Sequence, residues 1–487
     1  MYKLNQNNTP LFNALLEYVN KGNIPFHVPG HKKGVGMERQ FKEFLGDNVF
    51  KIDVTLLKLV DSLHHPTGVI KEAQELAADA YGSDACFFSI QGTTGAVQAM
   101  ILSVVGEGDK IIIPRNVHKS VTTGIIMSGA IPIYMKPEFN KRLGIAQGVT
   151  PETVAETLAN HPDAKAVLII NPTYYGVATD IKKITDIVHS YNMPLIVDEA
   201  HGPHLGFNEK LPLSAMDAGA DMCAQSTHKI IGSLTQSSLL HVKKERIDVR
   251  RVQQILNIIQ TTSPSYILMA SLDCARKQIA LEGKKLLDST IELANYARKK
   301  INNIQGLYCF GDDILGDPGV YAIDSTKITI SCRDLGITGY QLDNILADNY
   351  GILVELSDLY NILAVGSFGD TKEGIDQLIQ ALKEISSKHI KKKTRQPDFI
   401  DIPAIPKAFL TPRQAFNSSK TSISLKDSVG RISGEFLMAY PPGIPILCPG
   451  EIISKDIIEY TEELKAAGLY VQGTEDTSIE YIKVVNI

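Results

Sequence analysis

The sequence predicts an α/β fold in which a mainly parallel sheet carries helices on both faces. Short apolar segments alternate with helical stretches after residue 82. Strands that alternate with helices favour parallel pairing, because a parallel connection needs a crossover long enough to hold a helix. The strands are expected at 111–113, 131–135, 166–170, 195–197, 222–224 and 238–242. Active sites on such sheets lie at the carboxyl ends of the strands.

A chain of 487 residues is too long for a single hydrophobic core, so several domains are expected. The predicted divisions are a loop-rich N-terminal lead segment at 1–65, a large cofactor-binding domain at 66–305, a small α+β domain at 306–385, a linker at 386–406 and a C-terminal domain at 407–487. The linker is predicted from a basic run followed by prolines, and a solvated linker explains that run better than a nucleic-acid site does.

Local patterns give further expectations. A helix is predicted over 71–81 with Gly82 as its C-cap, and a helical run is predicted over 97–105. In the small domain, strands are expected at 327–331 and 352–355.

Composition narrows the class of protein. The net charge of -5 argues against a dedicated nucleic-acid surface. The six cysteines are scattered singly, without the spacing of metal ligands, so we expect reduced thiols and no metal site. The N-terminus lacks the pattern of a secretory leader, and no apolar run approaches the roughly 18 residues of a membrane span. A cytoplasmic location is therefore expected.

The main chemical signal is a carboxylate followed by a lysine. Asp198 ends an apolar strand, and Lys229 lies 31 residues later in the run 224–229 (AQSTHK). A pyridoxal 5'-phosphate (PLP) site requires this pair, because an aspartate keeps the pyridine nitrogen protonated and a lysine binds the aldehyde as a Schiff base. Either residue alone would also fit a helix-capping Asp or an exposed loop Lys. Their spacing favours the cofactor site.

A phosphate-binding turn is predicted at 91–96 (QGTTGA), just before the helical run. Small residues at the start of a helix leave backbone N–H groups free, and the helix dipole favours an anion there. Thr93, Thr94 and Gly95 are the candidates in this turn. Ser226 and His228, beside the lysine, also suit phosphate oxygens.

Three histidines are further candidates. His118 follows the strand 111–113 and is expected at the same edge of the sheet, where an imidazole could stack on the pyridine ring. A polar loop histidine is the alternative interpretation. His201 and His204 follow Asp198 closely, and one of them could support its carboxylate.

Taken together, these runs resemble the Orn/Lys/Arg decarboxylase family of fold-type-I PLP enzymes, and most of all its shorter Gram-positive biosynthetic arginine decarboxylases. The runs that carry the resemblance are 27–34 (HVPGHKKG), 91–95 (QGTTG), 114–120 (PRNVHKS), 197–202 (VDEAHG), 226–229 (STHK), 430–435 (GRISGE) and 440–445 (YPPGIP). The receiver-like wing domain of the large members is not expected, nor are their ring-shaped assemblies.

The resemblance implies a role for each candidate residue. Lys229 would bind the cofactor aldehyde, Asp198 would pair with the pyridine nitrogen and His118 would stack on the ring. Ala200 would pack on the opposite face, with His201 nearby. The phosphate would be held by Thr93, Thr94, Gly95, Ser226 and His228.

The resemblance also implies a homodimer, or a dimer of dimers, with active sites at the subunit interface. Thr262 and Ser263 would then reach the cofactor of the partner.

The implied reaction is decarboxylation of a basic amino acid, L-arginine to agmatine and carbon dioxide, in polyamine biosynthesis. Lysine and ornithine stay open as substrates. An aminotransferase on the same fold, with Arg333 as a clamp for the substrate carboxylate, is a rival, as is a non-catalytic PLP-binding regulator. Acids that could meet the distal cation of the substrate are Asp53, Glu355, Asp358 and Glu435.

Overall fold

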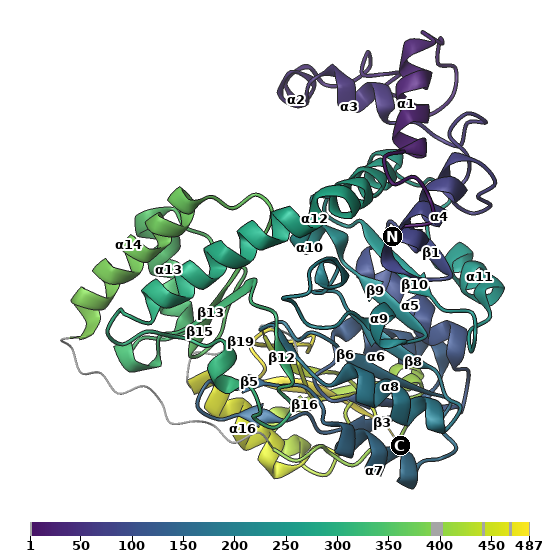
Figure 1. The fold of residues 1–487 in the computed structure, drawn as a ribbon. Helices are drawn as coiled ribbons and strands as arrows, with labels where there is room; N and C mark the ends of the chain where they lie inside the picture. Colours follow the sequence, from purple (N-terminus) through teal and green to yellow (C-terminus); the bar gives the residue numbers. More distant parts are fainter. Residues whose placement is uncertain (1, 391–402, 441–443, 467–469, 487) are drawn as a thin grey trace. The chain divides into compact units, whose positions relative to one another are not determined.

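The computed structural model describes residues 2–390, 403–440, 444–466 and 470–486 (Figure 1). The chain forms two compact units. The first is built from Met1–Ser103 and Ile196–Leu287, and the second from Val104–Leu195 and Asp288–Ile487. Both units are discontinuous in sequence, which a division into successive segments does not anticipate. The predicted division into five segments stays a prediction.

The first unit contains four neighbouring strands in the order β1, β10, β9 and β8. Their bounds are Ala85–Ser89, Ser238–Val242, Met222–Gln225 and Leu195–Asp198. β8 and β9 are parallel, whereas β10 is antiparallel to both β9 and β1. Three of these strands were predicted from the sequence. β1 was not predicted, and the direction of β10 was not anticipated.

Helices of the first unit follow the predicted pattern closely. α4 (Val69–Tyr81) ends at Gly82 in the left-handed conformation, as predicted. α5 (Gly92–Val104) begins within the predicted phosphate turn, five residues earlier than expected. The other helices are α9 (Ala215–Ala218), α10 (Thr227–Ile230), α11 (Val249–Ile259) and the long α12 (Tyr266–Ile301), which continues into the second unit.

The N-terminal lead segment is more helical than predicted. It carries α1 (Pro10–Asn20), α2 (Arg39–Leu45) and α3 (Asp47–Ile52). α1 buries Leu11, Leu15 and Tyr18 in a hydrophobic core with α4. No residue of α2 is buried. Most of the segment lies in loops, as expected, but these three helices were not predicted.

The second unit contains the parallel strands β6 (Ala166–Ile170), β2 (Lys110–Pro114) and β3 (Ile131–Met135), as predicted, with β2 in the middle. Helices α6 (Lys119–Ser128), α7 (Pro151–Asn160) and α8 (Ile181–Ser190) connect or follow them. Short antiparallel pairs add β4 (Phe139–Asn140) with β5 (Ile145–Ala146) and β7 (Val177–Ala178) with β12 (Ala322–Ile323).

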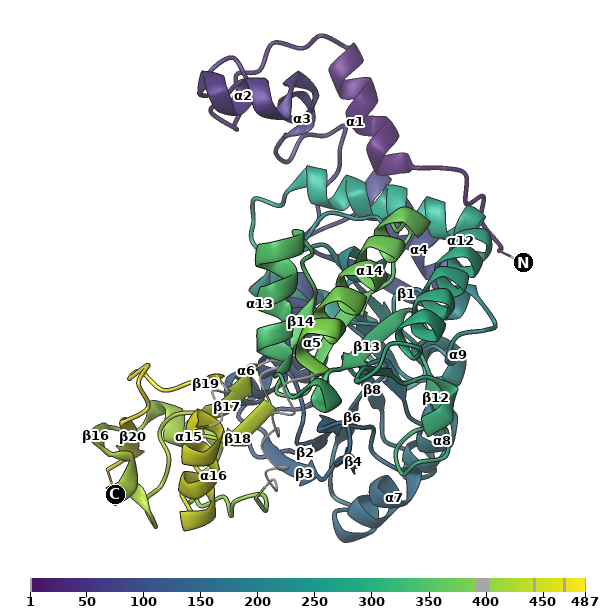
Figure 2. The ribbon, with the colours of Figure 1, turned by 90° about the vertical axis from the view of Figure 1, so that its left-hand side faces the viewer.

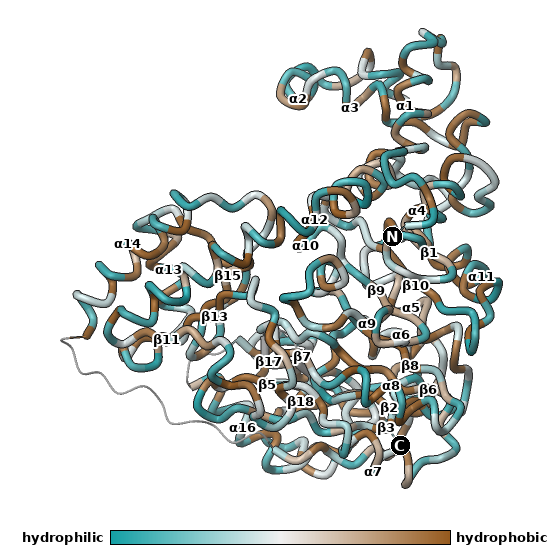
Figure 3. Tube along the Cα trace, viewed as in Figure 1, coloured by the Kyte–Doolittle hydropathy of each residue, from teal (hydrophilic) through white to brown (hydrophobic). Residues whose placement is uncertain are grey.

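A smaller α+β region follows in the second unit. An antiparallel sheet has the order β11 (Tyr308–Cys309), β13 (Lys327–Ser331), β15 (Asn361–Val365) and β14 (Leu356–Ser357), and it packs with α13 (Gly339–Tyr350) and α14 (Lys372–His389). Hydrophobic and hydrophilic residues alternate along α14, as expected for a helix with one buried face (Figure 3).

One prediction for this region, the strand at 352–355, was wrong. Residues 352–355 are not a strand, because only 356–357 enter the ladder with β15. α14 continues to His389, so the first residues of the predicted linker are helical. The rest of its basic run, from 391 on, lies outside the described residues.

The C-terminal region has a hydrophobic core of its own, which includes Leu437, Leu447, Ile457 and Val484. It contains α15 (Pro412–Asn417), α16 (Lys455–Ala466), the pair β16 (Lys420–Ser424) with β20 (Tyr481–Val485), and the sheet β18 (Ile444–Leu447), β17 (Leu437–Tyr440) and β19 (Tyr470–Gln472), which lie together in Figure 2. Throughout the described residues, no helix has the length and apolar character needed to span a membrane.

Candidate active site

Four segments of the first unit meet at one edge of its sheet. β8 and β9 are parallel, so Asp198 at the end of one strand lies at the same edge as Ser226 after the other. β10 runs in the opposite direction, and its first residue, Ser238, pairs with Ser89 at the end of β1. Thr93 follows β1 in the first turn of α5. The topology therefore gathers residues from distant parts of the sequence at one edge.

Three buried hydroxyl groups form a chain at this edge. Ser226 and Thr93 lie 2.6 Å apart, Thr93 and Ser238 lie 2.8 Å apart, and Ser238 donates to the carbonyl of Gln225 at 2.7 Å. Because each hydroxyl has one proton, the carbonyl fixes the direction of donation from Ser226 to Thr93 to Ser238. Ser226 therefore has one proton that it can turn from Thr93 to an anion.

The turn before α5 has the shape that a phosphate site needs. Gly92 has φ +66°, and its N–H donates to the carbonyl of Gln236 at 3.0 Å. A Cβ on Gly95 would lie 2.8 Å from the Cβ of Gln91, so the first turn requires glycine there. Thr93 is buried and Thr94 is exposed. The N-terminal N–H groups of a thirteen-residue helix and their dipole favour an anion at this point.

Lys229 lies on the short helix α10, where its backbone N–H donates to the carbonyl of Ser226 at 3.1 Å. Its Nζ lies 2.8 Å from Nε2 of His201, which is buried and follows Asp198 by three residues. An ammonium has no acceptor, so Lys229 donates and His201 accepts. The structure thus brings together two of the predicted residues.

Asp198 is buried, and its Oδ1 accepts a hydrogen bond from the N–H of Ala200 at 3.2 Å. His228 donates from Nδ1 to the carbonyl of Ser237 at 2.8 Å, since a carbonyl can only accept. His228 therefore carries a proton on Nδ1. His204 is also fully buried, directly before the 3-10 helix Leu205–Phe207.

Glu199, next to Asp198, is fully buried in the first unit. Its two carboxylate oxygens accept hydrogen bonds of 2.7 Å from the N–H of Ala215 and from Nε2 of Gln225. Burial raises the pKa of the Glu199 carboxyl to about 8, although both hydrogen bonds act in the opposite direction. We did not single out this residue from the sequence.

His118, the remaining predicted catalytic residue, belongs to the second unit. It is the N-cap of α6, where its Nδ1 accepts from the N–H of Ser120 at 3.2 Å and lies 2.8 Å from the Ser120 hydroxyl. Nδ1 is therefore unprotonated. A neutral His118 ring must carry its proton on Nε2.

Several of the residues predicted to contact the substrate already make hydrogen bonds or ion pairs within the fold. Arg333 donates to the carbonyl of Arg142 at 3.2 Å and lies over the ring of Tyr360. Asp358 accepts a hydrogen bond of 2.6 Å from the hydroxyl of Tyr175. Two backbone N–H groups of the C-terminal region donate to Glu435, and Asp53 pairs with His31 at 3.0 Å. Glu355, Thr262 and Ser263 are exposed.

Sequence reasoning missed Ser237 and Ser238, which complete the site at the start of β10. The polar run before the strand 238–242 was a signal for them. This polar run could be assigned to the site only once β10 was known to be antiparallel, because that direction places the start of β10 at the edge that holds Lys229.

The residues present fit PLP. The edge offers an amine, a buried carboxylate, a hydroxyl chain and the N-terminus of a helix, which are the groups that the aldehyde, the pyridine nitrogen and the phosphate require. The buried hydroxyl of Thr227, beside these groups, has no hydrogen-bond partner among the described residues. In the same described ranges, no cluster of His, Cys, Asp or Glu could hold a metal ion. These are the features expected of a PLP-dependent α/β enzyme.

Comparison with known proteins gives the family. Residues 9–374 match the model of the Orn/Lys/Arg decarboxylase major domain, and residues 398–477 match the C-terminal domain of the same family. The chain belongs to the Orn/Lys/Arg decarboxylase family.

Two curated relatives match over nearly their whole length. An arginine decarboxylase from Bacillus anthracis is 51% identical over 100% of this chain and 99% of its own. An arginine decarboxylase from Bacillus subtilis is 49% identical over 99% of both chains. Among solved structures, the lysine decarboxylase LdcF from Francisella novicida aligns with a TM-score of 0.86 and 25% identity, over 98% of this chain and 81% of its own. The fold is that of the fold-type-I PLP enzymes.

Proposed function

We propose that this protein is a PLP-dependent decarboxylase that converts L-arginine to agmatine and carbon dioxide. PLP chemistry is supported by one edge of the sheet, where buried Asp198 and the Lys229–His201 pair lie. Decarboxylation is supported by membership of the Orn/Lys/Arg decarboxylase family. Arginine as the substrate is supported by the whole-length similarity to the two Bacillus arginine decarboxylases.

The catalytic groups act through the cofactor. When bound, PLP supplies an aldehyde that takes up the substrate amine and a protonated ring that accepts the electron pair left by carbon dioxide. Lys229 would hold the cofactor aldehyde through Nζ, and His201, 2.8 Å from Nζ, would accept a proton from it. Asp198, fixed by the N–H of Ala200, keeps the proton on the pyridine nitrogen.

The phosphate is proposed to lie at the start of α5. Ser226 turns its proton from Thr93 to a phosphate oxygen, and the free N–H groups of the helix, those of Thr94 and Gly95 included, add further donors. His228 donates from Nε2 when its ring is protonated, because Nδ1 is already committed to the carbonyl of Ser237. Ala200 and His118 are proposed to cover the two faces of the ring.

His118 is also proposed to supply a proton to Cα of the product, in competition with Lys229. Its Nδ1 is fixed as an acceptor by Ser120, so Nε2 carries the proton of a neutral ring. A ring with only one protonated nitrogen has a defined donor atom, which is the requirement for positioned acid catalysis.

A homodimer, or a dimer of dimers, is part of the proposal. The lead segment exposes large apolar side chains, among them Phe26 at 94%, Val35 at 84% and Phe44 at 86%. α2 buries none of its residues, and a helix of seven residues is not stable in water by itself. A second copy that covers this surface would stabilise it. The exposed Thr262 and Ser263 are proposed to contact the cofactor of that copy.

A cytoplasmic role in polyamine biosynthesis completes the proposal. All six cysteines are free, and five of them are buried, which suits a reducing compartment. Agmatine is a diamine-type product with two basic groups, from which a polyamine can be built.

The test compares arginine, lysine and ornithine with the PLP-loaded enzyme. We expect carbon dioxide and agmatine, with kcat/KM highest for arginine, because acids recognise a guanidinium by two parallel hydrogen bonds that an ammonium cannot make. A higher kcat/KM for lysine or ornithine would correct the substrate and leave the reaction class. Keto-acid product would instead indicate an aminotransferase, which the occupied guanidinium of Arg333 argues against. Absence of any product would favour a non-catalytic PLP-binding regulator.

A further inference from the structure

The C-terminal region contacts the strand and helix that hold His118. Arg115 directly follows β2, three residues before His118, and it is buried. Its guanidinium donates to both carboxylate oxygens of Glu451, at 2.5 and 2.8 Å. It also donates to the carbonyls of Pro445 and Ile446, both at 3.0 Å. All these acceptors belong to the C-terminal region.

Glu451 is itself fixed in place. Its Oε2 also accepts from the N–H of Cys448 at 2.8 Å, and its side chain is 2% exposed. A bidentate pair between Arg and a carboxylate defines both the distance and the plane of the two groups. The backbone N–H of Arg115 donates to the carbonyl of Met135 in β3, so the residue is held at its main chain as well.

A second contact holds the other end of α6. Arg413, in α15, donates from Nε to the carbonyl of Ile126 at 2.8 Å and from Nη2 to that of Met127. These carbonyls have no acceptor role within the helix, and a cation at a helix C-terminus is also favoured by the dipole. Gly129, the C-cap with φ +75°, is required here, because a Cβ would lie 2.7 Å from the Arg413 guanidinium.

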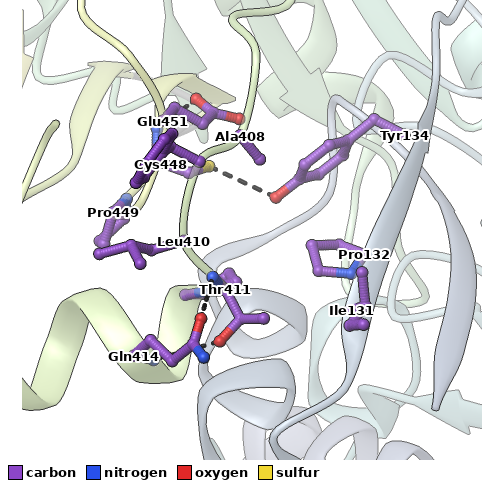
Figure 4. Close-up of a pocket in the computed structure, with 12 residues that line it drawn as sticks. Ile131, Pro132, Tyr134, Ala408, Leu410, Thr411, Gln414, Cys448, Pro449 and Glu451 are labelled. Atoms are coloured by element: carbon purple, nitrogen blue, oxygen red, sulfur yellow. Dashed lines mark hydrogen bonds between the residues drawn. The ribbon is translucent and has the colours of Figure 1, made fainter. Parts of the chain in front are cut away.

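The C-terminal region and β3 are not closely packed everywhere along their interface. Figure 4 shows Cys448 and Glu451 facing Tyr134 and Pro132 of β3 across a cavity of about 200 Å³. The hydroxyl of Tyr134 contacts Sγ of Cys448 at 3.6 Å. Burial raises the pKa of the Cys448 thiol to about 12, so it stays neutral beside the ion pair. The polar contacts thus link the C-terminal region to β2, β3 and α6 at defined atoms.

From these contacts we infer that Arg115, Glu451 and Arg413 are positioning residues for His118. The C-terminal region fixes residues 115–118 through Glu451 and the far end of α6 through Arg413. His118, as the N-cap of α6, lies between these two attachments, so its Nε2 is held where the helix places it. This inference rests on the proposed function of His118.

The first measurement is hydrogen exchange of the protein without cofactor. In Glu451→Gln, which keeps the shape and removes the charge, amides of residues 115–128 should exchange about 10-fold faster or more than in the wild type. Glu459→Gln is the matched control, because Glu459 pairs with Lys455 on the exposed face of α16 in the same region. Unchanged exchange in Glu451→Gln would overturn the inference alone, whatever the activity.

The second measurement is a double-mutant cycle on kcat with the PLP-loaded enzyme. Glu451→Gln should lower kcat about 10-fold or more with little change in KM, since a displacement of about 1 Å can cost 10²-fold. In a His118→Ala background the same substitution should have no further effect on kcat. An equal loss in both backgrounds would contradict positioning of His118. Full activity of His118→Ala would overturn its proposed role and, with it, the catalytic part of this inference.

Arg413→Gln provides a second variant in case Glu451→Gln does not fold. Its side chain is 31% exposed, so the substitution leaves no uncompensated buried charge. Exchange should rise at residues 119–128 first, and the effect on kcat should again vanish in the His118→Ala background. Faster exchange with wild-type kcat would contradict the inference, because it would show that the order of α6 does not control His118.

Discussion

Glu199 should make the stability of the protein fall as the pH rises. Burial raises the pKa of this carboxyl from 4.5 to about 8. Between these values the native protein binds one proton more than the unfolded chain, so the free energy of unfolding decreases with pH. The stabilising contribution is complete below pH 4.5 and is lost as the pH passes through 8. The slope is about 1.4 kcal/mol per pH unit, which gives about 4 kcal/mol between pH 5 and 8.

Glu199→Gln isolates this effect. The amide keeps the shape of the side chain and cannot ionise. A poorer hydrogen bond to Ala215 or Gln225 would therefore change the free energy of unfolding by the same amount at every pH. Neighbouring groups stay neutral in the same window, since burial raises the pKa of Cys223 well above 9 and lowers the pKa of His241 to about 3.

The assay is equilibrium denaturant unfolding of the protein without cofactor, from pH 5 to 9. The wild type should lose about 4 kcal/mol relative to the variant between pH 5 and 9, and the loss should level off above pH 8. Glu245→Gln, at a side chain that is 75% exposed, serves as the control and should follow the wild type. Parallel curves for wild type and Glu199→Gln would refute the reasoning, because they would show that Glu199 is ionised throughout.

Three predictions concern the cofactor. Lys229→Ala should abolish the visible absorbance of bound PLP, and borohydride reduction of the wild type should label Lys229; a label on another lysine would end this assignment. Asp198→Asn should keep the cofactor but lower kcat by about 10²-fold or more, and wild-type kcat would show that the ring is activated elsewhere. Thr93→Val should raise the Kd for PLP about 10-fold in a fluorescence titration, because it breaks the hydroxyl chain; an unchanged Kd would separate that chain from phosphate binding.

Local patterns were sufficient for most of the first unit's site. Asp198 and Lys229 each follow a short buried strand, and the helix after Gly92 has the small residues that a phosphate turn needs. Each of these signals lies within a few residues of the strand or helix that it accompanies, so the sequence alone carries it. The direction of β10 was not predicted from such a local signal. The twelve residues between β9 and β10 hold only the four-residue α10, which is too short for a parallel crossover, and this length was the overlooked clue.

The hydroxyl chain depends on that same strand. Ser226 was predicted from its place beside the lysine, whereas Ser238 meets Thr93 only because β10 reverses direction. A serine at the start of a strand has no local signature of function. Its role follows from which strands are neighbours, and pairing between strands is a property of the whole sheet.

The contacts proposed to position His118 were even harder to predict, because they join segments that are far apart in sequence. Arg115 and Glu451 are 336 residues apart in sequence, and each by itself resembles an ordinary loop charge. Burial changes their meaning, because removing two charges from water is unfavourable unless each satisfies the other in good geometry. In this chain the candidate chemical groups lie in short motifs, whereas the contacts around Arg115 join distant segments. If those contacts position His118, the C-terminal region takes part in catalysis without contributing an atom to the reaction.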